Sequence, residues 1–223
     1  MIQPNPATNT LAILLVALFF IPLGQAHVGP HPSVHDTVAG ILNRFKATLP
    51  TEEIVSMNLA KAKSLLTKEE RHILAHEHVS FHVNVPVKVF IIRDAAMGDK
   101  PFWLKERDFK PLGLKFKVQN RDVDFWVKDF QPGRVGLGIN SISGNDHHYG
   151  VALMPLKPEP KLEITKMYPG QLRTAPMKKG TAPFVDKNEK LPALPAVLSG
   201  LTVVQTVYEN RNDAKLIGIF RRT

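Results

Sequence analysis

The chain has 223 residues, a formal net charge of +9 and no cysteine. This length suits one well-buried domain with a helical appendage, and the absence of cysteine excludes disulfides and thiolate metal sites. The basic excess favours anionic polymers or phosphate-bearing ligands, although scattered Lys and Arg also serve solubility alone. No run of five or more basic residues occurs, so no nucleic-acid partner is expected.

The first 26 residues have the pattern of a secretory signal peptide. An uncharged apolar run from Leu11 to Leu23 is followed by Gly24-Gln25-Ala26, a small-x-small cleavage pattern. The run of 13 residues is shorter than the roughly 20 that a membrane-spanning helix needs. We therefore expect a secreted or periplasmic protein, with residues 1–26 removed and no transmembrane segment after cleavage.

Residues 27–78 are predicted to form helices. Two capping-box patterns, Ser33 to Asp36 and Thr67 to Glu70, indicate helix starts, and Pro50 ends the first helix. A helix from Thr51 to about residue 66 is expected between them, and the third helix ends near His76. The apolar stripes that support these helices are Val34, Val38, Ile41, Leu42 and Phe45 in the first, and Val55, Leu59, Ala62 and Leu66 in the second.

Residues 79–223 are predicted to form a β-sandwich. Apolar and polar residues alternate from Phe81 to Ile91, and Pro86 marks an edge, a bulge or a change of sheet. Further strands are expected at 114–119, 121–128, 134–142, 149–154, 201–208 and 216–220, with a Pro- and Lys-rich surface excursion at 155–195. The resulting fold is mainly β (α+β), an antiparallel β-sandwich with two or three N-terminal helices packed against it.

Histidines provide the candidate metal ligands. Cleavage before His27 would leave an α-amine and an imidazole on one residue, and His147 or His148 could complete a nitrogen-rich copper site. His72 and His76 are four residues apart on a predicted helix, but Ile73 stands where HExxH requires Glu. A solvated helix end is the alternative interpretation of that pair.

Two other patterns suggest ligands without assembling a catalytic site. The segment from Gly144 to His148 resembles a metallophosphoesterase Gly-Asn-His motif, but Asp146 separates Asn from His and the other metal-binding motifs are missing. Trp126 and Tyr149 are candidate ligand contacts of an aromatic surface. Packing of Trp126 beneath a helix is the alternative. Gly136, Gly138 and Gly144 are expected to allow close strand packing or bulges.

Several segments together resemble a known family. They are HPSVHDTVAGIL, HVNVPVKVFIIRD, GDKPFWL, DFWVKDFQPGRVGLGINSISG and VVQTVYENRNDAKLIGIFRRT. They resemble the N-terminal accessory module of secreted purple-acid-phosphatase-like metallophosphoesterases. In that family the metal ligands lie in a later catalytic domain, so the resemblance carries no catalytic residue onto this chain.

Three functions follow as hypotheses. The first is an exported non-catalytic accessory or binding module that supports a phosphoesterase or binds an anionic envelope polymer, and it needs no cofactor. The second is a metal-dependent phosphoesterase, as a fragment or a divergent form, that uses a divalent metal. The third is a copper-binding β-sandwich protein that uses His27.

Overall fold

The computed structural model describes residues 32–96, 100–114, 116–118, 121–142, 148–191, 194 and 196–208. Its helices are α1 (Val34–Thr48), α2 (Thr51–Val55), α3 (Leu59–Leu65), α4 (Lys68–His76) and α5 (Phe102–Glu106), with a short 3₁₀ helix η1 (Ala196–Leu198). Its strands are β1 (Val79–Val83), β2 (Val87–Asp94), β3 (Lys110–Pro111), β4 (Phe116–Val118), β5 (Arg121–Phe130), β6 (Gly133–Leu137), β7 (Gly150–Pro155), β8 (Ile164–Tyr168), β9 (Arg173–Pro176) and β10 (Thr202–Gln205). Among these helices, none is long and apolar enough to cross a membrane.

Local capping explains where the N-terminal helices begin. The Ser33 side chain accepts a hydrogen bond from the backbone N–H of Asp36 at the start of α1, and Thr67 and Glu70 complete a capping box at α4. Both predicted starts are confirmed. The single helix expected from Thr51 is wrong, because α2 ends at Val55 and Asn58 caps a separate helix, α3.

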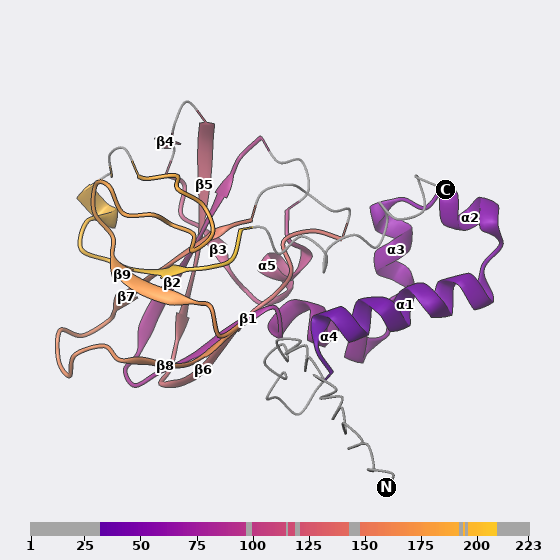
Figure 1. Cartoon of the computed structure of the whole chain (residues 1–223), viewed down its shortest axis with the longest axis horizontal. Helices are drawn as coiled ribbons and strands as arrows, with labels where there is room; N and C mark the ends of the chain where they lie inside the picture. Colours follow the sequence, from indigo (N-terminus) through magenta and orange to yellow (C-terminus); the bar gives the residue numbers. More distant parts are fainter. Residues whose placement is uncertain are drawn as a thin grey trace, which may run out of the picture.

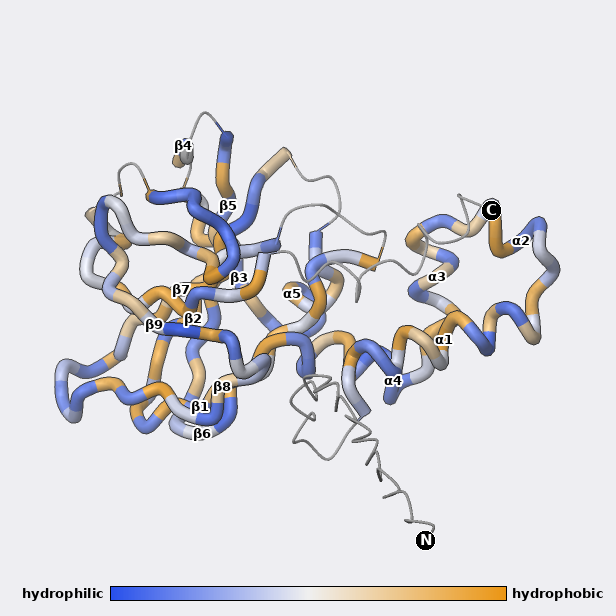
Figure 2. The backbone as a smooth tube through the Cα atoms, in the orientation of Figure 1, coloured by the Kyte–Doolittle hydropathy of each residue, from blue (hydrophilic) through white to orange (hydrophobic). Residues whose placement is uncertain are grey.

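The helices are arranged as an arm beside the sheets. Figure 1 shows α1, α2 and α3 extending to one side, with α4 and α5 next to the strands. Hydrophobic and hydrophilic residues alternate along α1 (Figure 2), and its apolar side, including Ile41 and Phe45, is buried. These residues and Leu74 of α4 belong to the core that the strands also form. The N-terminal helices therefore add to the sandwich core.

Pro86 lies where the chain passes from the smaller sheet to the larger one, which is one of the three roles predicted for it. The residues before it form β1, the middle strand of a three-stranded sheet of order β6-β1-β8. The residues after it form β2, which lies inside a seven-stranded sheet of order β3-β5-β2-β7-β10-β9, with β4 also paired to β5. All these named strands pair antiparallel. The predicted mainly β, sandwich-like fold is confirmed.

Two cores lie on the two faces of the larger sheet. Val89 and Ile91 of β2 join the principal core, together with Phe81 of β1. Phe90 points the other way and joins a second core with Met177 and Leu198 from the segment that follows β9. The alternation along β2 therefore buries both faces, one beneath the smaller sheet and the helices, the other beneath residues 177–201.

The excursion predicted at 155–195 is more ordered than expected. It contains β8, which pairs with β1, and β9, which pairs with β10. Asn84 holds the segment before β8, because its side chain bonds the backbone of Lys161 at 3.0 Å and of Glu163 at 2.8 Å. Both strands lie at sheet edges and are largely exposed, so they show no apolar alternation. The predicted hairpin arm at 201–208 contains β10, and its partner at 216–220 lies outside the described residues.

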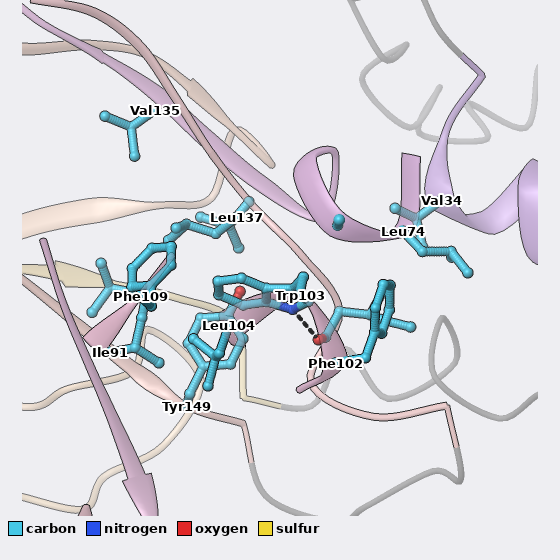
Figure 3. Close-up of a cluster of buried hydrophobic side chains, with 14 of the residues drawn as sticks. Val34, Leu74, Ile91, Phe102, Trp103, Leu104, Phe109, Val135, Leu137 and Tyr149 are labelled. Carbon is cyan, nitrogen blue, oxygen red and sulfur yellow. Dashed lines mark hydrogen bonds between the residues drawn. The ribbon is translucent and has the colours of Figure 1, made fainter. Parts of the chain in front are cut away.

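Gly138 allows close packing of the chain against α4 and α5. An added Cβ at Gly138 would lie 2.5 Å from Nε1 of Trp103 and 2.6 Å from the carbonyl oxygen of Leu74. Trp103 fills this position from α5, and its Nε1–H donates to the Ile139 carbonyl at 2.8 Å. Figure 3 shows the indole among Leu104, Phe109, Leu137 and Tyr149. The sequence predicted close strand packing or a bulge here, whereas the close neighbours of Gly138 come from α4 and α5.

Candidate functional site

The predicted copper ligands are only partly described. His27 and His147 lie outside the described residues. His148 is buried, with 9% of its surface exposed, and both of its ring nitrogens have partners. Its Nδ1 lies 2.7 Å from the Tyr149 carbonyl oxygen, and its Nε2 lies 2.9 Å from Nε2 of His78. Copper binding by His148 would have to break one of these contacts, and it stays a prediction.

The His78–His148 contact has the geometry of a hydrogen bond. The ring centroids are 5.1 Å apart with an interplanar angle of 27°, so the two Nε2 atoms face each other nearly along the line between the rings. A carbonyl can only accept, so neutral His148 carries its proton on Nδ1 and donates to Tyr149. His148 then accepts at Nε2 from the Nε2–H of His78, and this pair joins the start of β7 to the segment before β1.

His72 and His76 form a stacked pair. Their centroids are 4.2 Å apart with an interplanar angle of 21°, and Nδ1–H of His76 donates to the His72 carbonyl at 2.9 Å. Burial, together with the nearby cation of Arg107, lowers the pKa of His76 to about 4. Stacked rings do not direct their nitrogens at a common point. Within the described part of the chain, no three His, Cys, Asp or Glu side chains are grouped to hold a metal ion.

Trp126 and Tyr149 lie in the interior. Trp126 is 4% exposed and shares the principal core with Trp103 of α5, and Tyr149 is fully buried. The Tyr149 hydroxyl donates to the Gly138 carbonyl at 2.6 Å, and burial raises the pKa of the phenol. Their burial gives both rings a place in the core and leaves no exposed ring face of the kind that an aromatic ligand surface requires.

The structure has a cavity that the sequence did not predict, although one predicted metal ligand, His148, is among its lining residues. It has a volume of about 130 Å³ and lies between the second face of the larger sheet and the segment that follows β9. Apolar side chains dominate its lining, among them Phe116, Phe125, Met177, Leu191, Leu198 and Val203. The floor is the larger sheet, which includes β10, and the cover is formed by Tyr208 and by lining residues of the segment between β9 and β10, from Met177 to Leu198.

Charged side chains are also part of the cavity lining. Asp94, at the end of β2, accepts a hydrogen bond from the Ala96 backbone at 2.9 Å and lies 3.9 Å from Nη1 of Arg121 on β5. Glu189 contributes a carboxylate from the cover, and His148 lines the cavity from the start of β7. A mostly apolar enclosure with a few polar groups is the usual form of a small-ligand site.

A second charged pair lies in the larger sheet, and one of its members, Arg93, also lines the cavity. Nε of Arg93 is 3.6 Å from Oδ1 of Asp124, on the neighbouring strand at the same register position. The Arg93 side chain is completely buried. Burial raises the pKa of Asp124, and the Arg93 cation opposes that shift. This pair forms part of the sheet structure next to the cavity.

No local motif could have identified the cavity. Its lining residues come from β2, β4, β5, β7, β10 and the cover, and they span residues 92 to 208. Comparisons with known proteins do not help to identify the site, since no family model, no curated protein and no solved structure matches the chain.

Proposed function

We propose that this chain is a non-catalytic binding module that holds a small apolar ligand, or the apolar end of a larger one, in the cavity between the larger sheet and the segment that follows β9. The apolar lining of the cavity is the observation that carries this proposal. Burying a ligand of that character removes apolar surface from water, which gains about 25 cal/mol for each Å².

The cavity volume limits the size of the ligand that can be enclosed. A cavity of about 150 Å³ lined by Leu, Ile and Phe binds benzene in an engineered protein, and the cavity here has a volume of about 130 Å³. A single ring or a short branched acyl group therefore fits, with a polar substituent directed toward Asp94 and Arg121. A larger ligand would place only one end inside.

Benzene is a direct probe of this cavity. We expect saturable binding by titration calorimetry, with an increase in the thermal midpoint of unfolding as benzene is added. Gly150→Val is the blocking variant, because an added Cβ there lies 3.7 Å from the Cβ of Ile92, an ordinary contact, and the larger side chain takes up cavity space. Benzene affinity should fall at least tenfold in this variant.

Gly40→Val is the matched control. This glycine lies in α1 with open space where its Cβ would be, far along the chain from every cavity-lining residue. It should leave benzene affinity unchanged. Benzene binding that is equal in Gly150→Val and the native protein would refute the cavity as the site, and no saturable binding would refute the proposal.

The other predicted properties remain proposals of the same kind. Export is proposed from the signal-peptide pattern of residues 1–26, and a phosphoesterase partner is proposed from the family resemblance. An anionic polymer as partner is favoured by the +9 charge. The cavity supports none of these directly, because its occupant is expected to be apolar.

A further inference from the structure

Three basic side chains form a row across the smaller sheet. His82 lies on β1, the middle strand, directly opposite Arg134 on β6. On the other side His82 pairs with Thr165 of β8, and Lys166 is the next residue. Adjacent strands are about 4.8 Å apart, so the row from β6 to β8 spans about 10 Å.

His82 and Arg134 lie on the outer face of this sheet, and Lys166 lies beside them at the register shift between β1 and β8. Phe81 and Val83 point into the principal core, so His82 between them points away from it. Arg134 and Lys166 are exposed. Nη1 of Arg134 would lie 2.9 Å from a Cβ added at Gly136, which places the guanidinium along the outer side of β6.

The backbone and an ion pair fix two members of the row. Arg134 forms an ion pair with the buried carboxylate of Glu77. Lys166 adopts a left-handed conformation, with φ of 48°, beside a register shift between β1 and β8. A non-glycine residue in that conformation costs roughly 1–2 kcal/mol, and such strain is concentrated at functional sites.

The electrostatic environment of His82 is cationic. Partial burial, then Lys166 and Arg134, lower its pKa. A bound anion would interact with Lys166, with Arg134 beside its Glu77 partner, and with His82 once it is protonated.

We propose that this row, His82 with Arg134 and Lys166, binds phosphate groups of a linear polyanion. A guanidinium fork and an ammonium are the two side-chain groups that proteins use most for phosphate. The site is separate from the apolar cavity, since the larger sheet lies between the two. If the row does not bind a polyanion, the expected binding of benzene in the cavity is unaffected.

Inorganic polyphosphate is the probe, with binding followed by calorimetry at fixed salt steps. Lys166→Glu should weaken binding at least tenfold and reduce the slope of affinity against salt concentration. Lys179→Glu makes the same charge change on the exposed segment that follows β9 and is the matched control. Equal losses in the two variants would show that the net charge of the chain, and not the row, attracts the polymer.

The titration of His82 gives an independent readout. Saturation with polyphosphate should raise its NMR pKa, because the anion counteracts the cations of Lys166 on β8 and of Arg134 on β6, the second of which also pairs with the Glu77 carboxylate. An unchanged pKa at saturation would overturn the assignment to this row. Equal binding of polyglutamate would overturn the assignment to phosphate.

Discussion

Replacing Gly138 by alanine tests the packing that joins the helices to the sheets. The added Cβ would lie 2.5 Å from Nε1 of Trp103 and 2.6 Å from the Leu74 carbonyl oxygen. Neither neighbour can yield easily, because Trp103 is fully buried and the other atom belongs to the backbone. The chain at residue 138 must therefore move away from α4 and α5.

That movement strains three hydrogen bonds. They are Trp103 Nε1–H to the Ile139 carbonyl at 2.8 Å, Ile139 N–H to the Leu74 carbonyl at 2.8 Å, and the Tyr149 hydroxyl to the Gly138 carbonyl at 2.6 Å. Each contributes about 0.5–1.5 kcal/mol, and overpacking adds about 1–3 kcal/mol. We expect a loss of about 2–5 kcal/mol in the free energy of unfolding, a large share of the usual 5–15 kcal/mol.

Urea denaturation followed by tryptophan fluorescence measures this loss, with the slope m compared between variants. Gly150→Ala is the matched control, because the nearest atom to its added Cβ is 3.7 Å away. It should change the free energy of unfolding by less than about 1 kcal/mol. A Gly138→Ala loss below about 1 kcal/mol with an unchanged slope would refute the packing argument.

Three further changes test other parts of the structure. Tyr149→Phe removes the donor to the Gly138 carbonyl and should cost about 1–3 kcal/mol in urea denaturation, because that carbonyl stays buried without its partner; a neutral result would contradict the bond. Thr67→Ala removes the N-cap of α4 and should cost about 1 kcal/mol, whereas Thr67→Ser should cost less. The His76 pKa is 6.5 in the unfolded chain and about 4 in the folded one, so stability should fall as pH decreases between these values. His76→Gln should flatten that part of the pH profile, and an unchanged profile would show that His76 does not cause it.

The secondary structure of the N-terminal half was largely predictable, because its signals are local. The N-caps Ser33 and Thr67 act within one helical turn, and Pro86 interrupts a strand ladder wherever it stands. The break after Val55 was missed because Asn58 can cap a helix or occupy one, and the apolar stripe continues across it. In the structure Asn58 caps α3, and Val55, which the predicted stripe placed on the buried side, is 47% exposed.

The candidate sites were not predictable, because residues far apart in the chain form them. The cavity lining spans residues 92 to 208, and the basic row takes one residue from each of three strands. His148 was visible as a histidine in a polar loop, but its partner His78 is 70 residues earlier. No spacing rule relates such positions, since strand order and register decide them.

The sequence by itself determined the fold class and the direction of most side chains along the strands, because the two-residue alternation of a strand is a property of the chain. The tertiary structure decided which surfaces meet. It placed β8 and β9 at sheet edges, buried Trp126 and Tyr149 in the core, and left a cavity between the larger sheet and the segment that follows β9. Those outcomes depend on the pairing of distant strands, and no local pattern contains that information.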